Sequence, residues 1–302
     1  MDVNKTPTKI VISASRRTDI PAFYLDWFMV QINRGYFDVI NPYNRRASIV
    51  PATPEAVHTI VFWSKNFGPF LERGIGEQLQ QKGFHLFFNF TINSDEPVLE
   101  PHVPTLKERL KQLQYLSSRF DPRAINWRFD PICFYKDNSD VKNNLHDFEP
   151  IADAAGRCGV SRCITSFMDD YPKIRKRVKS ATGFSFIDPP PERKLEILLN
   201  MQNELSLKNI RLYTCCEKDL LAALPANTGI EKSSCIPNDI FVKLYGGNLS
   251  FKRDGGQRIK NGCACMISVD IGSYQLHPCY HGCLFCYANP ASSVTIAGRC
   301  TQ

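Results

Sequence analysis

Short apolar runs alternate with amphipathic stretches over most of the chain. The runs are rich in β-branched and aromatic residues, which is typical of buried strands. Seven of them lie at residues 9–15, 37–40, 58–63, 84–91, 124–131, 162–167 and 209–215. The stretches between them repeat apolar residues at helical spacing, as in 106–116 and 192–207. This alternation predicts parallel βα units rather than hairpins.

Polar side chains follow several of the predicted strands. The charged ones are Arg16, Arg17, Asp19, Lys65, Arg128 and Asp130. A (β/α) barrel keeps its active site at this end of its strands. We therefore predict an α/β fold in which residues 1–232 form a (β/α) barrel-like domain, of the TIM type or a partial barrel. A doubly wound open sheet would show a similar alternation, so it stays open as an alternative.

The sequence pattern and composition change near Ser233. Helical periodicity becomes weaker there, and glycine, cysteine and basic residues become more frequent. We expect residues 233–290 to form an irregular, cysteine-rich iron–sulfur segment that packs on the barrel mouth. Residues 291–302 are expected to be a flexible tail.

Composition and charge narrow the class of protein. The chain has 302 residues, a net charge of +7 and 12 cysteines. No apolar run reaches the roughly 18–20 residues needed to span a bilayer, and the N-terminus lacks the basic and apolar regions of a secretory signal. These features predict a cytoplasmic protein without a membrane partner. In that reducing compartment, clustered cysteines usually bind metal or take part in catalysis.

Three cysteines near the C-terminus form the strongest motif. Cys279, Cys283 and Cys286 have C-x3-C-x2-C spacing, and the aromatic Phe285 directly precedes the third. Three thiolates on one short loop can hold three irons of a cubane cluster and leave the fourth iron free. The motif resembles the cluster motif of radical S-adenosylmethionine (SAM) enzymes. In that superfamily it normally follows the first strand, whereas here it closes the chain.

This resemblance implies a [4Fe–4S] cluster whose open iron binds the amino and carboxylate groups of SAM. Reductive cleavage would then yield a 5′-deoxyadenosyl radical that abstracts hydrogen from a substrate. The residues that we predict to bind the cofactor are Ser13, Phe285, Tyr287 and Asn289. A zinc ion completed by His277 or His281 is the alternative.

A second set of cysteines comprises Cys215, Cys235, Cys263 and Cys265. Four thiolates could fully ligate an additional iron–sulfur cluster or a zinc ion. The alternative is that they are unconnected buried thiols. Cys215 is preferred to Cys216, which would point the opposite way if the strand continued.

The charged residues at the strand ends have two interpretations. Arginines grip carboxylates or phosphates, and carboxylates orient hydroxyl or amino groups. Alternatively, arginines and aspartates from neighbouring strands pair with one another at the barrel rim. Lys65 is a candidate acid/base or anion contact. The basic run at 173–179 is either a solvated helix face or a phosphate contact.

Motifs along nearly the whole chain, from residue 13 to 289, together resemble the DUF1848 family of uncharacterised proteins. The matching pieces include 13–21, 62–66, 127–131, 214–217, 263–265 and 279–289. The resemblance implies a C-terminal cysteine cluster similar to that of radical SAM enzymes, with no assigned reaction.

The combined hypothesis is a radical SAM-like enzyme that acts on a small-molecule or nucleic-acid substrate. It would take electrons from a ferredoxin- or flavodoxin-like donor. One alternative is a non-enzymatic iron–sulfur or zinc protein that senses redox state or binds nucleic acid. Another is a nucleic-acid repair lyase resembling spore photoproduct lyase.

Overall fold

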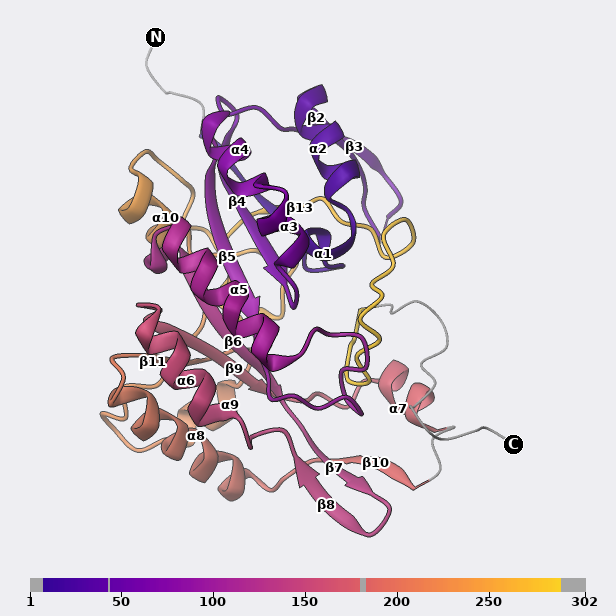
Figure 1. Cartoon of the computed structure of the whole chain (residues 1–302), viewed down its shortest axis with the longest axis vertical. Helices are drawn as coiled ribbons and strands as arrows, with labels where there is room; N and C mark the ends of the chain where they lie inside the picture. Colours follow the sequence, from indigo (N-terminus) through magenta and orange to yellow (C-terminus); the bar gives the residue numbers. More distant parts are fainter. Residues whose placement is uncertain (1–7, 43, 180–182, 289–302) are drawn as a thin grey trace.

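The computed structural model describes residues 8–42, 44–179 and 183–288, so the predicted tail and Asn289 lie outside the described residues. Eight of the described strands form one parallel sheet (Figure 1). They are β1 (Ile10–Ala14), β4 (Val57–Ser64), β5 (His85–Thr91), β6 (Ile125–Ile132), β9 (Arg162–Phe167), β11 (Arg211–Thr214), β12 (Glu231–Lys232) and β13 (Val269–Asp270). The prediction of an α/β fold with parallel strands is confirmed.

The strands of this sheet follow one another in chain order. From β1 to β12, each strand of the sheet pairs with the next one in the chain. The last strand, β13, pairs with β1. This is the cyclic order of an eight-stranded (β/α) barrel. A closed barrel would also need β12 to pair with β13, and the sheet of the described residues does not contain that pair. Closure therefore stays a prediction.

Helices connect the strands, and most of them cover one face of the sheet. They are α1 (Ile20–Phe23), α2 (Leu25–Arg34), α3 (Gly68–Glu72), α4 (Ile75–Gln81), α5 (Leu106–Arg119), α6 (Phe148–Arg157), α7 (Pro172–Val178), α8 (Pro191–Ser206), α9 (Lys218–Ala223) and α10 (Asn238–Tyr245), with 3-10 turns at Pro122–Ala124 and Ile259–Asn261. Helix α5 begins with a capping box between Thr105 and Glu108, which satisfies backbone donors that the helix itself leaves unpaired.

The two faces of the sheet bury two different cores. Ile60 and Phe62 of β4 pack into the large cluster shared with α2, α5, α6 and α8. Val61, which points the other way because strand side chains alternate, packs against Ile236 and Phe241. The chain after β12 thus fills the face that the connecting helices leave open. Strands buried on both faces explain the near-continuous apolar runs in the sequence.

Two small antiparallel sheets correct the prediction that excluded hairpins. One joins β2 (Tyr36–Ile40) to β3 (Ala47–Pro51), and the other joins β7 (Phe134–Asp137), β8 (Asp140–Asn143) and β10 (Phe184–Ile187). In β2, residues 37 and 39 are buried while 38 and 40 are exposed. That alternation suits a sheet covered on one face only. The 37–40 run is therefore a strand, but it lies outside the parallel sheet.

The cysteine-rich segment is continuous with the main body in the described residues. It contributes β13 to the edge of the parallel sheet and Phe241, Leu249 and Cys263 to the second core. No helix within the described part of the chain is long and apolar enough to cross a membrane.

Candidate metal and substrate site

A cavity of about 270 Å³ lies at the carboxyl ends of β1, β4, β5, β6, β9 and β11. Most of the predicted site residues line it. They are Arg16, Arg17, Asp19, Lys65, Arg128, Asp130, Cys215, Cys235, Cys263, Cys265, Cys279, Cys283, Cys286, Phe285 and Tyr287. Ser13 is not among them: it is fully buried in β1, and its hydroxyl donates to Asp270 at 2.7 Å.

The C-terminal cysteine loop, residues 279–286, is fixed to the body of the protein by backbone contacts. The Leu284 N–H donates to the Leu99 carbonyl at 2.9 Å, and the His102 N–H donates to the His281 carbonyl at 3.2 Å. The guanidinium of Arg177 donates to three carbonyls of the loop, those of residues 283, 284 and 286, at 3.2, 2.5 and 3.0 Å. Figure 1 shows α7, which carries Arg177, beside the yellow C-terminal segment.

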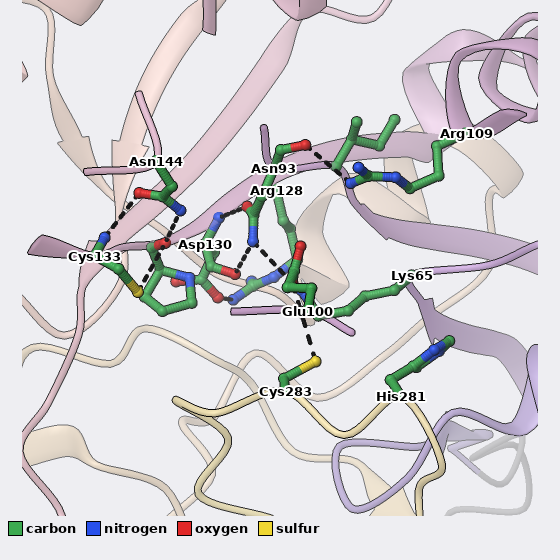
Figure 2. A network of polar contacts seen from close by, with 12 residues as sticks. Lys65, Asn93, Glu100, Arg109, Arg128, Asp130, Cys133, Asn144, His281 and Cys283 are labelled. Atoms are coloured by element: carbon green, nitrogen blue, oxygen red, sulfur yellow. Dashed lines mark hydrogen bonds and ion pairs between the residues drawn. The ribbon is translucent and has the colours of Figure 1, made fainter. Parts of the chain in front are cut away.

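A buried ion pair borders the loop (Figure 2). Lys65 pairs with Glu100, whose Oε1 lies 4.0 Å from the Cys283 sulfur, and the Lys65 ammonium stands 5.3 Å from the Phe285 ring centroid. Burial alone lowers the pKa of Lys65, but the Glu100 carboxylate and Cys283 outweigh it, so the pKa is raised. Burial also raises the pKa of the Cys283 thiol well above its usual value. Lys65 therefore stays charged beside this sulfur.

Asn93 connects this ion pair to β6 through hydrogen bonds, as Figure 2 shows. Its amide donates to Glu100 at 3.2 Å and accepts from the Asp130 N–H at 2.8 Å. The buried Arg109 donates in turn to the Asn93 carbonyl at 2.9 Å. The second carboxylate oxygen of Glu100, Oε2, is buried and has no hydrogen-bond partner among the described residues.

Asp19 organises the opposite side of the loop. Its carboxylate accepts from the Ser64 hydroxyl at 2.8 Å, from the Lys65 N–H at 2.9 Å, and lies 2.7 Å from His281 Nε2. The other ring nitrogen of His281 lies 3.2 Å from the His102 carbonyl. Both nitrogens of this histidine are therefore engaged, which argues against its role as a zinc ligand.

The second set of cysteines forms a ring of five thiols rather than a set of four. The five are Cys215, Cys216, Cys235, Cys263 and Cys265, and all of them line the cavity. The Cys235 N–H donates to the Cys265 sulfur at 3.3 Å. We call these five residues the thiol ring. The sulfurs of Cys215 and Cys216 are 3.8 Å apart.

Cys216 was missed because the prediction assumed that the strand continued through it. Strand β11 ends at Thr214, and Cys216 has a left-handed φ of 64°, so its side chain turns toward the same cavity as Cys215. Hydrogen bonds from neighbouring thiols lower the pKa of Cys215 and of Cys265 well below the usual value.

Three arginines surround the thiol ring. Arg128 pairs with Asp130 and donates to the Cys235 sulfur at 2.6 Å. Arg16 lies over the Trp63 ring, 5.3 Å from its centroid, and its Nη2 is buried without a partner among the described residues. Arg258 pairs with Asp169 and donates to the Tyr171 hydroxyl at 2.7 Å.

Arg17 also lines the cavity, and its guanidinium contacts the segment before the C-terminal cysteine loop. Its guanidinium donates to the Gly272 carbonyl at 2.8 Å and lies 3.9 Å from Asp270. The structural interpretation of the strand-end charges thus applies to Arg17 and, through Asp130, in part to Arg128.

Neither group of cysteines is arranged around a single point. Within the described residues, no three His, Cys, Asp or Glu side chains converge closely enough to hold one metal ion. A zinc ion needs four ligands that converge, whereas a cubane spreads its thiolates over several irons.

Glu100 is a buried contact of Lys65 and Cys283 that sequence reasoning missed. It lies in the connection between β5 and α5, residues 92–105. Connections of this kind usually have 2–6 residues, and longer ones are often functional. That length was the one signal that could have drawn attention to it.

Fold and site together define a parallel α/β protein with two groups of cysteines around one cavity at the carboxyl ends of its strands. The chain belongs to the DUF1848 family, described as a domain of unknown function, which matches residues 11–288. The expected family membership is thereby confirmed.

Other comparisons add little. No curated protein matches the chain. Among solved structures, a D-hydantoinase from a Bacillus sp. AR9 is similar at 12% identity and a TM-score of 0.32, over 59% of this chain and 40% of that chain. A second D-hydantoinase is similar at 13% identity and a TM-score of 0.32, over 66% and 46%. The chain spans less than half of these structures, and so remote a likeness carries no argument about activity.

Proposed function

We propose that this protein is a radical SAM-like enzyme that holds a [4Fe–4S] cluster on Cys279, Cys283 and Cys286. The observation that carries the proposal is that all three thiols line the same cavity as the charged residues at the strand ends. When bound, such a cluster supplies the electron that cleaves SAM, and the resulting 5′-deoxyadenosyl radical abstracts hydrogen from a substrate. We also propose that the parallel sheet forms a barrel-like arrangement around this cavity.

The loop suits a cluster with one open iron. It offers three thiols, and the nearby His281 is held by Asp19 and the His102 carbonyl. Lys65 and Arg177 place two cations beside the loop, which balances the negative charge of thiolate ligands. A position without a protein ligand is what chelation by an amino acid requires.

Glu100 and Arg16 supply complementary groups for the amino acid part of SAM. The buried Oε2 of Glu100 has no partner within the described chain, and neither does Nη2 of Arg16. A buried carboxylate oxygen of this kind accepts a hydrogen bond from an ammonium group, and a buried guanidinium N–H donates to a carboxylate. We assign Glu100 to the amino group and Arg16 to an anionic group of SAM or of the substrate.

The decisive experiment is anaerobic reconstitution followed by an assay of SAM cleavage. With a strong one-electron reductant in place of the ferredoxin- or flavodoxin-like donor, the wild type should absorb near about 400 nm and release 5′-deoxyadenosine. Cys283→Ala should lose this product, and Glu100→Gln should raise KM for SAM by about 10-fold.

Cys158→Ala is the matched control, because Cys158 is a half-buried thiol at the end of α6 and does not line the cavity. It should retain full cleavage. Cleavage that persists in Cys283→Ala, or a colourless protein with one bound zinc, would refute the proposal. Clusters without cleavage would favour the redox-sensing alternative.

A further inference from the structure

The thiol ring is a second site in its own right. We propose that it holds a second [4Fe–4S] cluster, ligated only by cysteines of the ring, with Arg16, Arg128 and Arg258 as its counter-charges. This proposal is independent of SAM cleavage, because it concerns a different set of ligands.

The first argument is convergence. The five thiols come from three separate parts of the chain: the end of β11, the segment after β12, and the segment before β13. All five line one cavity, the sulfurs of Cys215 and Cys216 are in contact, and the Cys235 N–H donates to the Cys265 sulfur. Unconnected buried thiols behave as small apolar side chains and have no reason to touch one another. The contacts therefore favour a shared ligand over five separate core residues.

The second argument is charge. Arg128 is fully buried, and Cys235 and Cys215 act on it together with Asp130. Arg16 faces Cys265 and Cys235, and Arg258 faces Cys216 and Cys215. A buried guanidinium is costly unless negative charge compensates it. Each of the three guanidinium groups lies beside a carboxylate, that of Asp254, Asp130 or Asp169, and a cluster ligated by four thiolates would add negative charge next to all three.

The third argument is hydrogen bonding to sulfur. The Cys235 N–H donates to the Cys265 sulfur at 3.3 Å, and Arg128 donates to the Cys235 sulfur at 2.6 Å. Donors of this kind orient metal-bound thiolates and raise the reduction potential of the cluster. A protonated thiol is only a weak hydrogen-bond acceptor, so these donors suit thiolate ligands better.

The ring has five thiols, whereas a cubane needs four ligands. The geometry indicates which two thiols compete for the same iron. Cys215 and Cys216 are adjacent, and their sulfurs lie 3.8 Å apart. Two thiolates on one tetrahedral metal, at about 2.3 Å each, are separated by about 3.8 Å. Because each iron of a cubane takes one protein thiolate, the pair supplies alternative ligands to the same iron.

The test uses the full chain with Cys279, Cys283 and Cys286 all changed to alanine, so that only the ring can bind iron. After anaerobic reconstitution with iron and sulfide it should hold about four irons and give the electron paramagnetic resonance signal of a reduced [4Fe–4S] cluster. Adding Cys235→Ala or Cys265→Ala should abolish the signal. Adding Cys215→Ala or Cys216→Ala alone should preserve it, and adding both should abolish it.

Circular dichroism separates loss of cluster from loss of fold, and Cys158→Ala in the same background should keep the signal. A folded triple variant that binds no iron overturns the proposal, as does a signal that survives Cys235→Ala and Cys265→Ala. Arg258→Gln, whose side chain is partly exposed, tests the counter-charges: iron content should be unchanged and the midpoint potential more negative. An unchanged potential would refute the role of Arg258.

Discussion

At the scale of single residues, Arg177 shows that one cation of an exposed basic run can hold a buried loop in place. The run at 173–179 forms α7 and its C-cap, and its other cationic side chains are exposed. Arg177 is half-buried and donates to three carbonyls of the C-terminal cysteine loop. Burial lowers its pKa, although Cys286 and Cys283 oppose that shift. We therefore regard Arg177 as a positioning residue for the loop.

Replacing Arg177 with glutamine should loosen the loop without unfolding the protein. Removing such an outer contact typically weakens metal binding by roughly 10- to 100-fold. We expect reconstituted Arg177→Gln to lose iron to a chelator about 10-fold faster than the wild type. Lys176→Gln, at an exposed position on the same helix, should match the wild type. Equal rates of iron loss in the two variants would contradict the assignment.

The sequence predicted site residues only where they belong to a local motif or follow a recognisable strand. The spacing of Cys279, Cys283 and Cys286 and the charges at the strand ends were readable because neighbours in sequence are neighbours in space there. Glu100 and Cys216 were not readable. Glu100 lies in a long irregular connection and contacts Lys65 and Cys283 from there. Cys216 reaches the cavity because its left-handed backbone reverses the expected direction of its side chain.

At the scale of elements, the junction of β1 and β13 depends on one carboxylate. Strand β13 has two residues, too few to hold the edge by backbone pairing alone. Asp270 accepts from the hydroxyls of Ser13 and Ser15 at 2.7 Å each and from the N–H groups of Arg16 and Gly272 at 2.8 and 3.0 Å. This carboxylate therefore fastens the last strand to the first.

Asp270→Ala should lower the free energy of unfolding by about 3 kcal/mol, because it leaves buried donors without a partner. Urea denaturation measures this change. Asp38→Ala removes an exposed i,i+4 pair with Arg34 and should cost less than about 1 kcal/mol. Gly272→Ala should also destabilise, since a Cβ there would lie 2.1 Å from the Ser15 hydroxyl oxygen. A loss in Asp270→Ala no larger than that in Asp38→Ala would show that this junction is not critical.

Strands were predictable from sequence in proportion to their burial. The six parallel strands of four to eight residues are largely buried and were all predicted. Strands β12 and β13 have two residues each, too short for any periodicity. The hairpin of β7 and β8 was missed because a turn residue sets it: Asn138 has a φ of 60°, a conformation that asparagine tolerates in tight hairpin turns.

At the scale of the whole molecule, the pairing of β13 with β1 explains how a late cysteine motif reaches the strand ends. Because β13 pairs with β1, the segment that follows β13 lies beside the segment that follows β1. Two contacts make this visible: Tyr24 donates to the Pro278 carbonyl at 2.5 Å, and Asp19 meets His281 at 2.7 Å. A motif at the end of the chain thereby reaches the neighbourhood of a motif placed after the first strand.

The overall charge and shape of the site favour a small-molecule substrate over nucleic acid. The net charge of +7 is spread along the chain, and within α7 Arg175 pairs with Asp170 at 3.3 Å while Arg177 turns to the cysteine loop. The cavity of about 270 Å³ is close to the size of typical small-molecule sites. Lys173, Lys176 and Lys179 are the exposed lysines that remain along α7 and its C-cap for phosphate contacts.

We accordingly expect only non-specific binding to single- and double-stranded DNA, with Kd no tighter than about 10⁻⁶ M at physiological salt. Fluorescence anisotropy across a salt series measures it. Changing the exposed Lys173, Lys176 and Lys179 together to glutamine should leave SAM cleavage unchanged, because none of them lines the cavity. Submicromolar binding that weakens steeply with salt and is lost in this variant would instead support the repair lyase, since counterion release scales with the number of phosphate contacts.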